Sequence, residues 1–101
     1  MGSVPSPLPA HAERVLDLVE RVPSGSVVTY GDVAEMLGEG SGRTVGRVMA
    51  LYGGAVPWWR VVLASGRPAP GHETEALRRL RAEGVPLRGD RIVLRDARWS
   101  G

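Results

Sequence analysis

Apolar residues recur every three to four positions over residues 10–21, a spacing that predicts an amphipathic helix. Val15 and Leu18 lie on its apolar face, and charged residues stand between them. Pro23-Ser24-Gly25 then predicts the turn that ends the helix. Residues 1–9 are rich in Pro and Ser, and we interpret them as a flexible arm.

Two shorter helices joined by a glycine-rich turn are predicted to follow. Thr29 and Asp32 resemble a capping box, which predicts a helix that continues through Leu37. Ser41 is a favourable N-cap for the second helix, over about residues 42–52. Short helices joined by a tight turn are typical of the helix-turn-helix of DNA-binding proteins. An ordinary helical hairpin with a polar outer face is the simpler alternative.

The second of these helices has an apolar face and an arginine-bearing face. Val45, Val48 and Met49 are expected to point inward. Gly46 and Ala50 on the other face are small, as a close approach to a DNA groove requires. We therefore favour the DNA-binding interpretation. The residues expected to contact DNA are Tyr30, Gly42, Arg43, Thr44, Gly46 and Arg47.

The remaining segments predict short strands and one more helix. Residues 26–30 and Val61-Val62 are β-branched and predict brief strands. A charged helix is expected over residues 74–83, and residues 85–94 predict a closing β-hairpin or wing. Together these elements predict a small α/β (α+β) winged helix-turn-helix domain over residues 10–95, with a short C-terminal β-hairpin and a tail over residues 96–101.

Composition narrows the possible functions. The chain of 101 residues has no cysteine, which excludes disulfides, thiolate metal sites and cysteine nucleophiles. Its 13 basic residues are all arginine and its net charge is +2. Arginine matches phosphate bidentately and stacks on bases, so a nucleic-acid partner is plausible. A GC-rich genome would produce the same arginine content.

Neither a metal nor a cofactor is expected. His11 and His72 lack companions suited to metal binding. No apolar run approaches the roughly 18 residues that span a membrane. The first residues lack a basic, apolar export signal. We therefore expect an intracellular monomer, cytoplasmic or nucleoid-associated in a bacterium, with no membrane partner.

Two adjacent tryptophans follow a proline near the middle of the chain. Pro57 fixes its own backbone and disfavours helix at Val56, so a rigid, non-helical step is expected. The indoles are either a plug in the core or the wall of a base-binding pocket. The neighbouring helix-turn-helix favours the pocket. Its expected residues are Pro57, Trp58, Arg60 and Tyr30.

Four motifs, in order, resemble the DNA-binding domain of the O6-alkylguanine-DNA alkyltransferases. Residues 22–34 resemble that family's entry into its helix-turn-helix, and residues 42–46 resemble the segment that carries its arginine finger. Residues 57–62 stand where the enzymes have Pro-Cys-His-Arg-Val. Residues 82–84 stand where they have a glutamate ahead of a glycine. The resemblance covers about residues 10–95.

One departure from that family determines the expected function. Trp58 stands at the position of the alkyl-accepting cysteine, and an indole is not such a nucleophile, so we expect no enzyme. Tryptophan at this position is the mark of the alkyltransferase-like proteins, which bind alkylated guanine without repairing it. The resemblance implies a sensor that flips O6-alkylguanine out of duplex DNA and hands the site to damage-recognition proteins of nucleotide excision repair. A plain winged-helix regulator and a repair-protein interaction module remain alternatives.

Further roles follow for single residues. Trp59 replaces the family's histidine, which pairs with the glutamate that Glu83 matches, and we expect the Trp59 indole to donate a hydrogen bond to Glu83. A flipped base leaves a gap in the stack. Arg43 is expected to fill this gap and Tyr30 to press on the rotating phosphate. The simpler alternatives are Arg43 as an ordinary phosphate contact and Tyr30 as a core residue.

Overall fold

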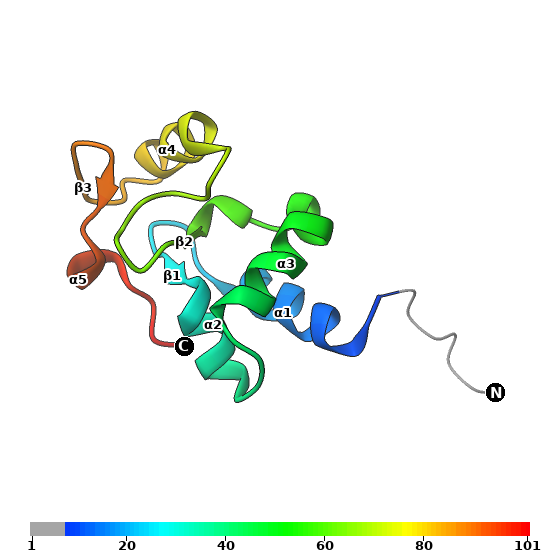
Figure 1. The fold of residues 1–101 in the computed structure, drawn as a ribbon. Coiled ribbons are helices and arrows are strands. Elements are labelled where there is room, and N and C mark those ends of the chain that lie inside the picture. Colours follow the sequence, from blue (N-terminus) through cyan, green and yellow to red (C-terminus); the bar gives the residue numbers. More distant parts are fainter. Residues whose placement is uncertain (1–7) are drawn as a thin grey trace.

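The computed structural model describes residues 8–101, so residues 1–7, most of the predicted arm, lie outside the described residues. The described part of the chain contains five α-helices and two pairs of short strands (Figure 1). It is the small α+β domain that the sequence predicts, with an antiparallel hairpin near the C-terminus.

Three helices form the first half of the domain: α1 (Ala10–Arg21), α2 (Tyr30–Leu37) and α3 (Gly42–Tyr52). Their bounds agree with the predicted helices. Each helix buries its periodic apolar stripe against the other two, which is the largest stabilising term available to a domain of this size. The buried residues of this cluster include Val15, Leu18, Val19, Val33, Val45 and Val48.

Capping boxes begin α2 and α3. The Asp32 backbone N–H donates to Thr29 Oγ1, and the Thr29 N–H donates to the Asp32 carboxylate, both at 3.0 Å. Ser41 and Thr44 exchange the same pair of bonds at the start of α3. Gly38, with φ +69°, ends α2 in the left-handed conformation. These local signals set the helix-turn-helix geometry, because each cap satisfies backbone N–H groups that the helix itself leaves free.

A short parallel pair of strands separates two hydrophobic clusters. Strand β1 (Val28–Thr29) pairs with β2 (Val61–Val62), with Val28 opposite Val61. Val28 and Val61 belong to the helical cluster, whereas Val27 and Val62 belong to a second cluster. Successive side chains of a strand point to opposite faces, so the pair forms a wall shared by both cores.

The second cluster lies beneath the C-terminal elements. These are α4 (Glu73–Ala82), β3 (Leu87–Arg88), β4 (Arg91–Ile92) and the short helix α5 (Leu94–Ala97). The predicted hairpin is confirmed as the antiparallel pair of β3 and β4. The cluster's buried residues are Val27, Val62, Leu80, Val85, Ile92 and Ala97.

Two sequence-based expectations about the backbone differ from the structure. The tryptophan step is not free of helix, because Trp58–Arg60 forms one 3₁₀ turn after Pro57. Pro57 does fix the entry to this turn, but Pro is compatible with a helical first turn. Residues 96–101, expected as a tail, return to the domain, since Trp99 donates its backbone N–H to the Val27 carbonyl at 2.8 Å.

Candidate nucleic-acid interface

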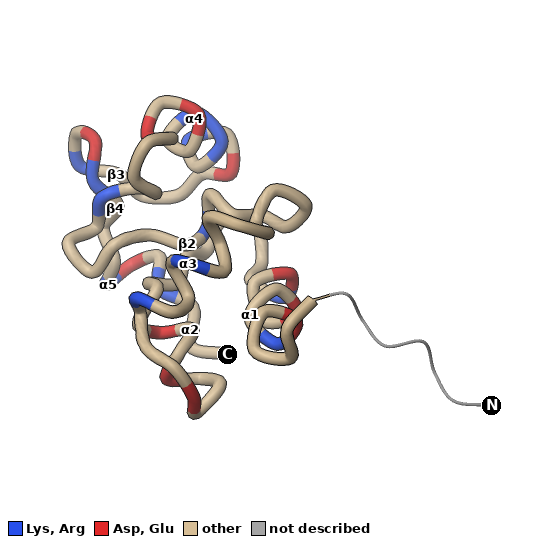
Figure 2. The backbone as a smooth tube through the Cα atoms, turned by 45° about the vertical axis from the view of Figure 1, so that its right-hand side comes forward, with Lys and Arg blue, Asp and Glu red and all other residues tan. Residues whose placement is uncertain are grey.

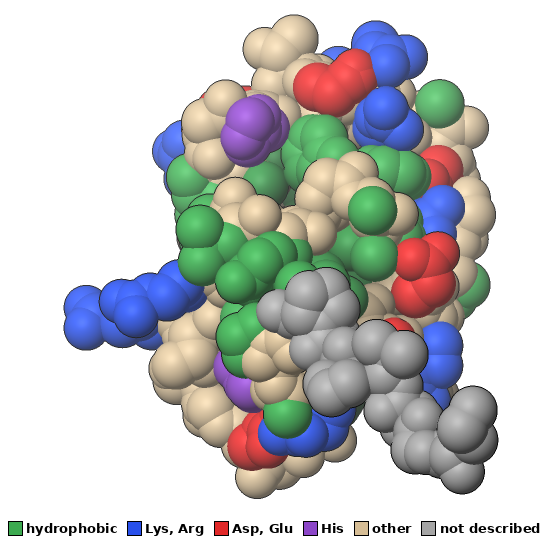
Figure 3. Space-filling model, turned by 90° about the vertical axis from the view of Figure 1, so that its right-hand side faces the viewer, with side chains coloured by type: hydrophobic (Ala, Val, Ile, Leu, Met, Phe, Trp, Pro, Cys, Tyr) green, Lys and Arg blue, Asp and Glu red, His purple; other side chains and the backbone are tan. Residues whose placement is uncertain are grey.

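A cavity of about 750 Å³ opens beside α3. Its walls come from α3, from the first residues of α2, from the tryptophan turn and from the loop that precedes α4. Apolar side chains gather at the middle of this side of the molecule, while basic side chains project at its edge (Figure 3). The lining residues are Tyr30, Gly31, Gly42, Gly46, Met49, Ala50, Gly53, Gly54, Trp58, Leu63, Ala64, Ala69, Pro70 and His72.

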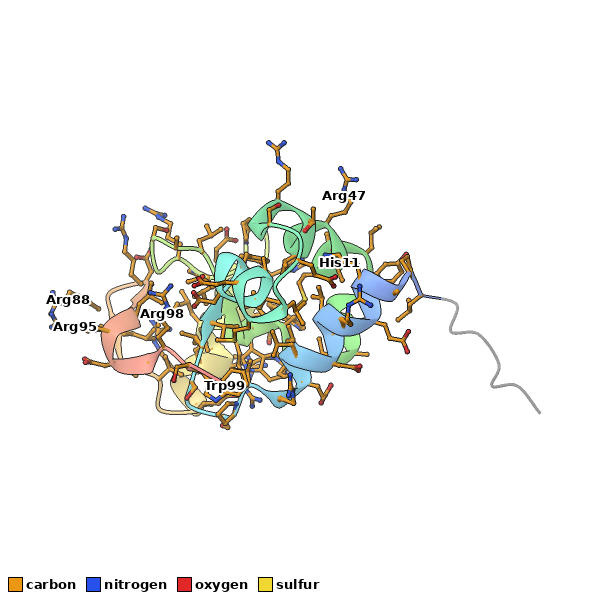
Figure 4. The ribbon with its side chains drawn as sticks, turned by 90° about the horizontal axis from the view of Figure 1, so that it is seen from below. His11, Arg47, Arg88, Arg95, Arg98 and Trp99 are labelled. Atoms are coloured by element: carbon orange, nitrogen blue, oxygen red, sulfur yellow. The ribbon has the colours of Figure 1, made fainter. Side chains whose placement is uncertain are left out.

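Helix α3 presents two different surfaces. The surface toward the cavity carries small and apolar residues, whereas Arg43, Thr44 and Arg47 are exposed outside the cavity. Basic residues are the only charged residues on α3, whereas α1 and α4 carry both signs (Figure 2). Arg47 projects away from the body of the domain (Figure 4). A polyanion approaching α3 therefore meets positive charge directly beside an apolar hollow.

The small residues of α3 serve the cavity. A methyl group at Gly42 would lie 3.4 Å from the Gly31 nitrogen, and one at Gly46 would lie 3.9 Å from the Tyr30 ring. Both distances are ordinary van der Waals contacts, so α3 lies about one methyl group away from the start of α2 at these positions. Gly46 and Ala50, expected to make room for a DNA groove, both line the cavity, and their contact with DNA stays a prediction.

Three side chains with aromatic rings, Tyr30, Trp58 and His72, line the cavity. The ring of Trp58 lies 5.5 Å from that of His72, centroid to centroid, with 60° between their planes. Tyr30 is half-buried, and burial raises the pKa of its phenol, so it remains a neutral donor at physiological pH. The cavity therefore offers flat π surfaces and a hydroxyl group, the combination that suits a heterocyclic base.

The hydrogen bond predicted between Trp59 and Glu83 is present. The Trp59 indole N–H donates to Glu83 Oε2 at 2.8 Å. The same carboxylate accepts from Arg60 Nη2 at 2.8 Å and from the Gly25 backbone N–H at 3.2 Å. Only 12% of the Glu83 side chain and 16% of the Arg60 side chain are exposed. Glu83 thus ties the tryptophan turn to the end of α4 and to the turn after α1.

Burial raises the pKa of Glu83, but the hydrogen bonds from Arg60, Trp59 and Gly25 outweigh it and hold the pKa below its usual range. The carboxylate is therefore ionised at neutral pH and fully engaged by donors. A group in this state positions its neighbours but is poorly suited to accept a proton in a reaction.

The position of Arg60 differs from the expectation. Its guanidinium also donates to the Val22 carbonyl at 2.9 Å, and it does not line the cavity. Pro57, also expected in the pocket, is buried behind the lining. Arg60 is drawn away because a buried carboxylate needs a cationic partner, and Glu83 is the one within reach.

Contacts around Trp59 also hold Trp58 in place. The two indoles meet edge to face, with centroids 5.8 Å apart and planes at 88°. The Arg79 guanidinium lies 4.4 Å from the centroid of the Trp59 ring. Trp59 is thus fixed from both its edge and its face, and it supports the indole that faces the cavity.

A second buried carboxylate fixes the start of α2. Arg98 donates to both oxygens of Asp32, at 2.6 and 2.8 Å. The hydrogen bond from Arg98 is the main reason why the pKa of Asp32 lies below its usual range. Asp32 is two residues from Tyr30, so this contact stabilises the helix turn that carries the cavity tyrosine.

The sequence-based set of site residues is brought together only in part. Tyr30, Gly42, Gly46 and Trp58 line the cavity. Arg43, Thr44 and Arg47 lie on the adjacent exposed surface of α3, and Trp59 with Glu83 lies behind the cavity. The lining residues in the loops were not predicted. The Pro and Gly content of these segments indicates a turn, but it does not indicate where the side chains of the turn point. The missed lining residues include Gly53, Gly54, Leu63, Ala64, Pro70 and His72.

Within residues 8–101 no group of three or more His, Asp or Glu side chains is arranged to hold a metal ion. No helix in the same range is both long and apolar enough to cross a bilayer.

Known proteins are similar to this chain in sequence and in fold. A DNA base-flipping protein of Escherichia coli (strain K12) is 38% identical over 94 residues, which cover 87% of this chain and 73% of the relative. A DNA base-flipping protein of Vibrio parahaemolyticus serotype O3:K6 (strain AQ3810) is 30% identical over 92 residues, covering 85% of this chain and 92% of that protein.

A solved structure of similar fold is that of S. pombe Atl1 in complex with damaged DNA containing O6-carboxymethylguanine. It has a TM-score of 0.77 and 28% identity, and the match covers 89% of this chain and 94% of Atl1. Residues 10–85 match the family described as 6-O-methylguanine DNA methyltransferase, DNA binding domain. The chain therefore belongs to this family, as an alkyltransferase-like protein.

Proposed function

We propose that this protein is a non-enzymatic sensor of O6-alkylguanine in duplex DNA, which flips the modified base into the cavity beside Trp58. The observation that carries the proposal is the cavity itself, an aromatic and apolar hollow adjoining the basic surface of α3. Its volume of about 750 Å³ falls within the range of small-molecule sites, so it accommodates a base with a substituent.

Flipping requires that the lost stacking be compensated. Extruding a base costs a few kcal/mol, and stacking on an aromatic side chain returns about 1–3 kcal/mol. Trp58 supplies that surface, and the neutral Tyr30 hydroxyl supplies a donor at the cavity entrance. In this proposal Arg43, which is exposed in the first turn of α3, fills the vacated stack. Arg47, one turn later, contacts the phosphate backbone.

An alkyl modification favours this route. An O6-alkyl group blocks the Watson–Crick edge of guanine, so unpairing the damaged base costs less than unpairing normal guanine. The apolar cavity wall then accepts the alkyl group. The complex of Atl1 with DNA containing O6-carboxymethylguanine supports this choice of lesion.

The fate of the lesion follows from the missing nucleophile. With no cysteine in the chain, the cavity has no thiolate to accept the alkyl group, so the bound lesion persists until other proteins remove it. We propose that these are damage-recognition proteins of nucleotide excision repair, which excise a nucleotide whatever its alkyl group.

The test compares two duplexes that differ only in guanine or O6-methylguanine. Wild-type protein should bind the lesion duplex more tightly, and Trp58→Ala should lose about 5- to 150-fold on the lesion duplex, the equivalent of 1–3 kcal/mol. Fluorescence anisotropy with labelled duplexes measures both. Leu51→Ala is the control, because Leu51 lies on α3, is 67% exposed and does not line the cavity. Equal wild-type affinity for the two duplexes would favour a plain winged-helix regulator instead.

A further inference from the structure

We infer that Arg88, Arg91 and Arg95 form a second DNA-binding surface, which contacts phosphates of the duplex to one side of the flipped base. We call these three residues the C-terminal basic surface. The inference rests on the proposed function for its position relative to the lesion. The matched family region ends at residue 85, so the surface lies beyond it.

The surface begins with a hairpin that pairs two like charges. Arg88 and Arg91 stand directly opposite each other in the register of β3 and β4, and both are exposed. Like charges at directly opposed positions destabilise a strand pair. Within residues 8–101 neither side chain forms an ion pair or a hydrogen bond that would offset the repulsion. An arrangement that costs stability in the free protein is explained if an anion neutralises it.

Arg95 extends the same surface. It lies on α5, three residues after the hairpin, and 77% of its side chain is exposed. Its only ion pair among the described residues is a long contact of 3.9 Å with the exposed Asp96. Arg88 and Arg95 project together from one end of the domain, away from Arg47 on α3 (Figure 4). In Figure 1, β3 and α5 adjoin at that end.

The other arginines of the described chain have local explanations. Carboxylates bind five of them, which are Arg14, Arg60, Arg78, Arg79 and Arg98. Arg21 and Arg81 lie in the last turns of α1 and α4, where a cation is favoured by the helix dipole. Besides Arg67 in the loop before α4, the arginines that remain lie on the exposed surface of α3 and on the C-terminal basic surface.

Duplex DNA is the partner that fits this chemistry. Three guanidinium groups on separate elements match a row of phosphates, each of which accepts a bidentate contact. Such contacts carry no sequence information but add affinity and fix the orientation of the protein. Two separated basic surfaces on one small domain therefore determine to which side of the lesion the protein extends.

The experiment compares two double variants that remove the same charge. Arg88→Ala/Arg91→Ala alters the surface, and Arg21→Ala/Arg81→Ala is the matched control. The salt dependence of binding to an undamaged duplex and to an O6-methylguanine duplex is measured for each. Losing two phosphate contacts should reduce the slope of log K against log salt by about 2, so the affinity ratio of wild type to variant falls roughly tenfold between 50 and 200 mM salt. The control should keep the wild-type slope, and Arg88→Lys/Arg91→Lys should recover most of it.

Asymmetric duplexes test the direction. In each of two duplexes the lesion lies near one end, so that a long arm of DNA extends on one side of it only. The long arm lies on opposite sides of the lesion in the two duplexes. The Arg88→Ala/Arg91→Ala variant should lose affinity on one of them and not on the other, with an unchanged preference for the lesion on symmetric DNA. A wild-type slope in this variant, an equal loss in the control, or equal losses on both asymmetric duplexes would overturn the inference. The salt dependence of binding to the undamaged duplex tests the C-terminal basic surface even if the protein shows no preference for the lesion.

Discussion

Replacing Trp59 with Phe tests whether the contact with Glu83 is electrostatic or only a packing contact. The substitution keeps an aromatic ring but removes the indole N–H that lies 2.8 Å from Glu83 Oε2. Arg60 and Gly25 still donate to the carboxylate, so it loses one hydrogen bond but is not left without a donor. A hydrogen bond to a charged group contributes about 1.5–3 kcal/mol, and the remaining donors place the loss near the lower end. With some lost packing against Arg79, the expected destabilisation is about 2 kcal/mol.

Urea unfolding followed by far-ultraviolet circular dichroism measures this loss without relying on tryptophan fluorescence. For a domain of this size, about 2 kcal/mol moves the midpoint by on the order of 1 M urea. A double-mutant cycle with Glu83→Gln isolates the interaction, and we expect a coupling energy of about 1 kcal/mol between the two positions. A coupling energy of zero would refute the electrostatic reading and leave Trp59 as a packing residue.

The pH dependence gives an independent check. The pKa of Glu83 is lowered in the folded protein, so its contribution to stability is complete above the unfolded-state pKa and is lost as the pH falls through the folded-state pKa. Trp59→Phe removes one of the hydrogen bonds that lower this pKa. In the variant, the stability that Glu83 contributes should therefore begin to be lost at a higher pH. The stability gap between wild type and variant should therefore be widest near neutral pH and narrow in acid. A gap that stays constant into acid would contradict the reasoning.

Three further predictions concern other residues of the site. Incubation with O6-methylguanine DNA should add no alkyl group to the protein by intact-mass spectrometry, and Trp58→Cys alone should not restore efficient transfer, because the neighbouring indole cannot handle the proton. Arg43→Ala should weaken binding to lesion DNA more than to undamaged DNA in anisotropy titrations, whereas Arg47→Ala should weaken both alike and lower the salt slope by about 1. Arg98→Ala should cost on the order of 1 kcal/mol in thermal melts near pH 7, since that arginine is 52% exposed. The pKa of Asp32 is lowered mainly by Arg98, so this cost should vanish as the pH falls through that folded-state pKa.

The local elements were predictable because their signals lie within a few residues of each other. The stripe of Val15 and Leu18, the Thr29–Asp32 capping box and the Ser41 cap specify three helices without tertiary information. The Trp59–Glu83 bond spans 24 residues, and it was predictable only through the resemblance to a family with a polar pair at those positions.

Other features depend on contacts that no local pattern encodes. Arg60 binds a carboxylate 23 residues away, and Arg98 binds one 66 residues away. Either arginine could have stayed in solvent, since an exposed guanidinium has no strong preference for one partner. The cavity beside Gly46 was not predictable for a related reason. A glycine has no side chain to show what its face of the helix meets, so the neighbouring Tyr30 ring is found only in the structure.

A sensor and an alkyl acceptor make opposite demands on the carboxylate behind the cavity. An acceptor needs a carboxylate that helps a histidine to move a proton, and such a group must change its state during the reaction. Glu83 is instead saturated by Arg60, Gly25 and the indole of Trp59, whose N–H is a hydrogen-bond donor but neither an acid nor a base at physiological pH. The carboxylate is therefore fixed as a structural anion that holds the tryptophan turn against α4. Under the proposed function, rigidity of this turn favours binding, because Trp58 is oriented before a base enters the cavity and little conformational freedom is lost on association.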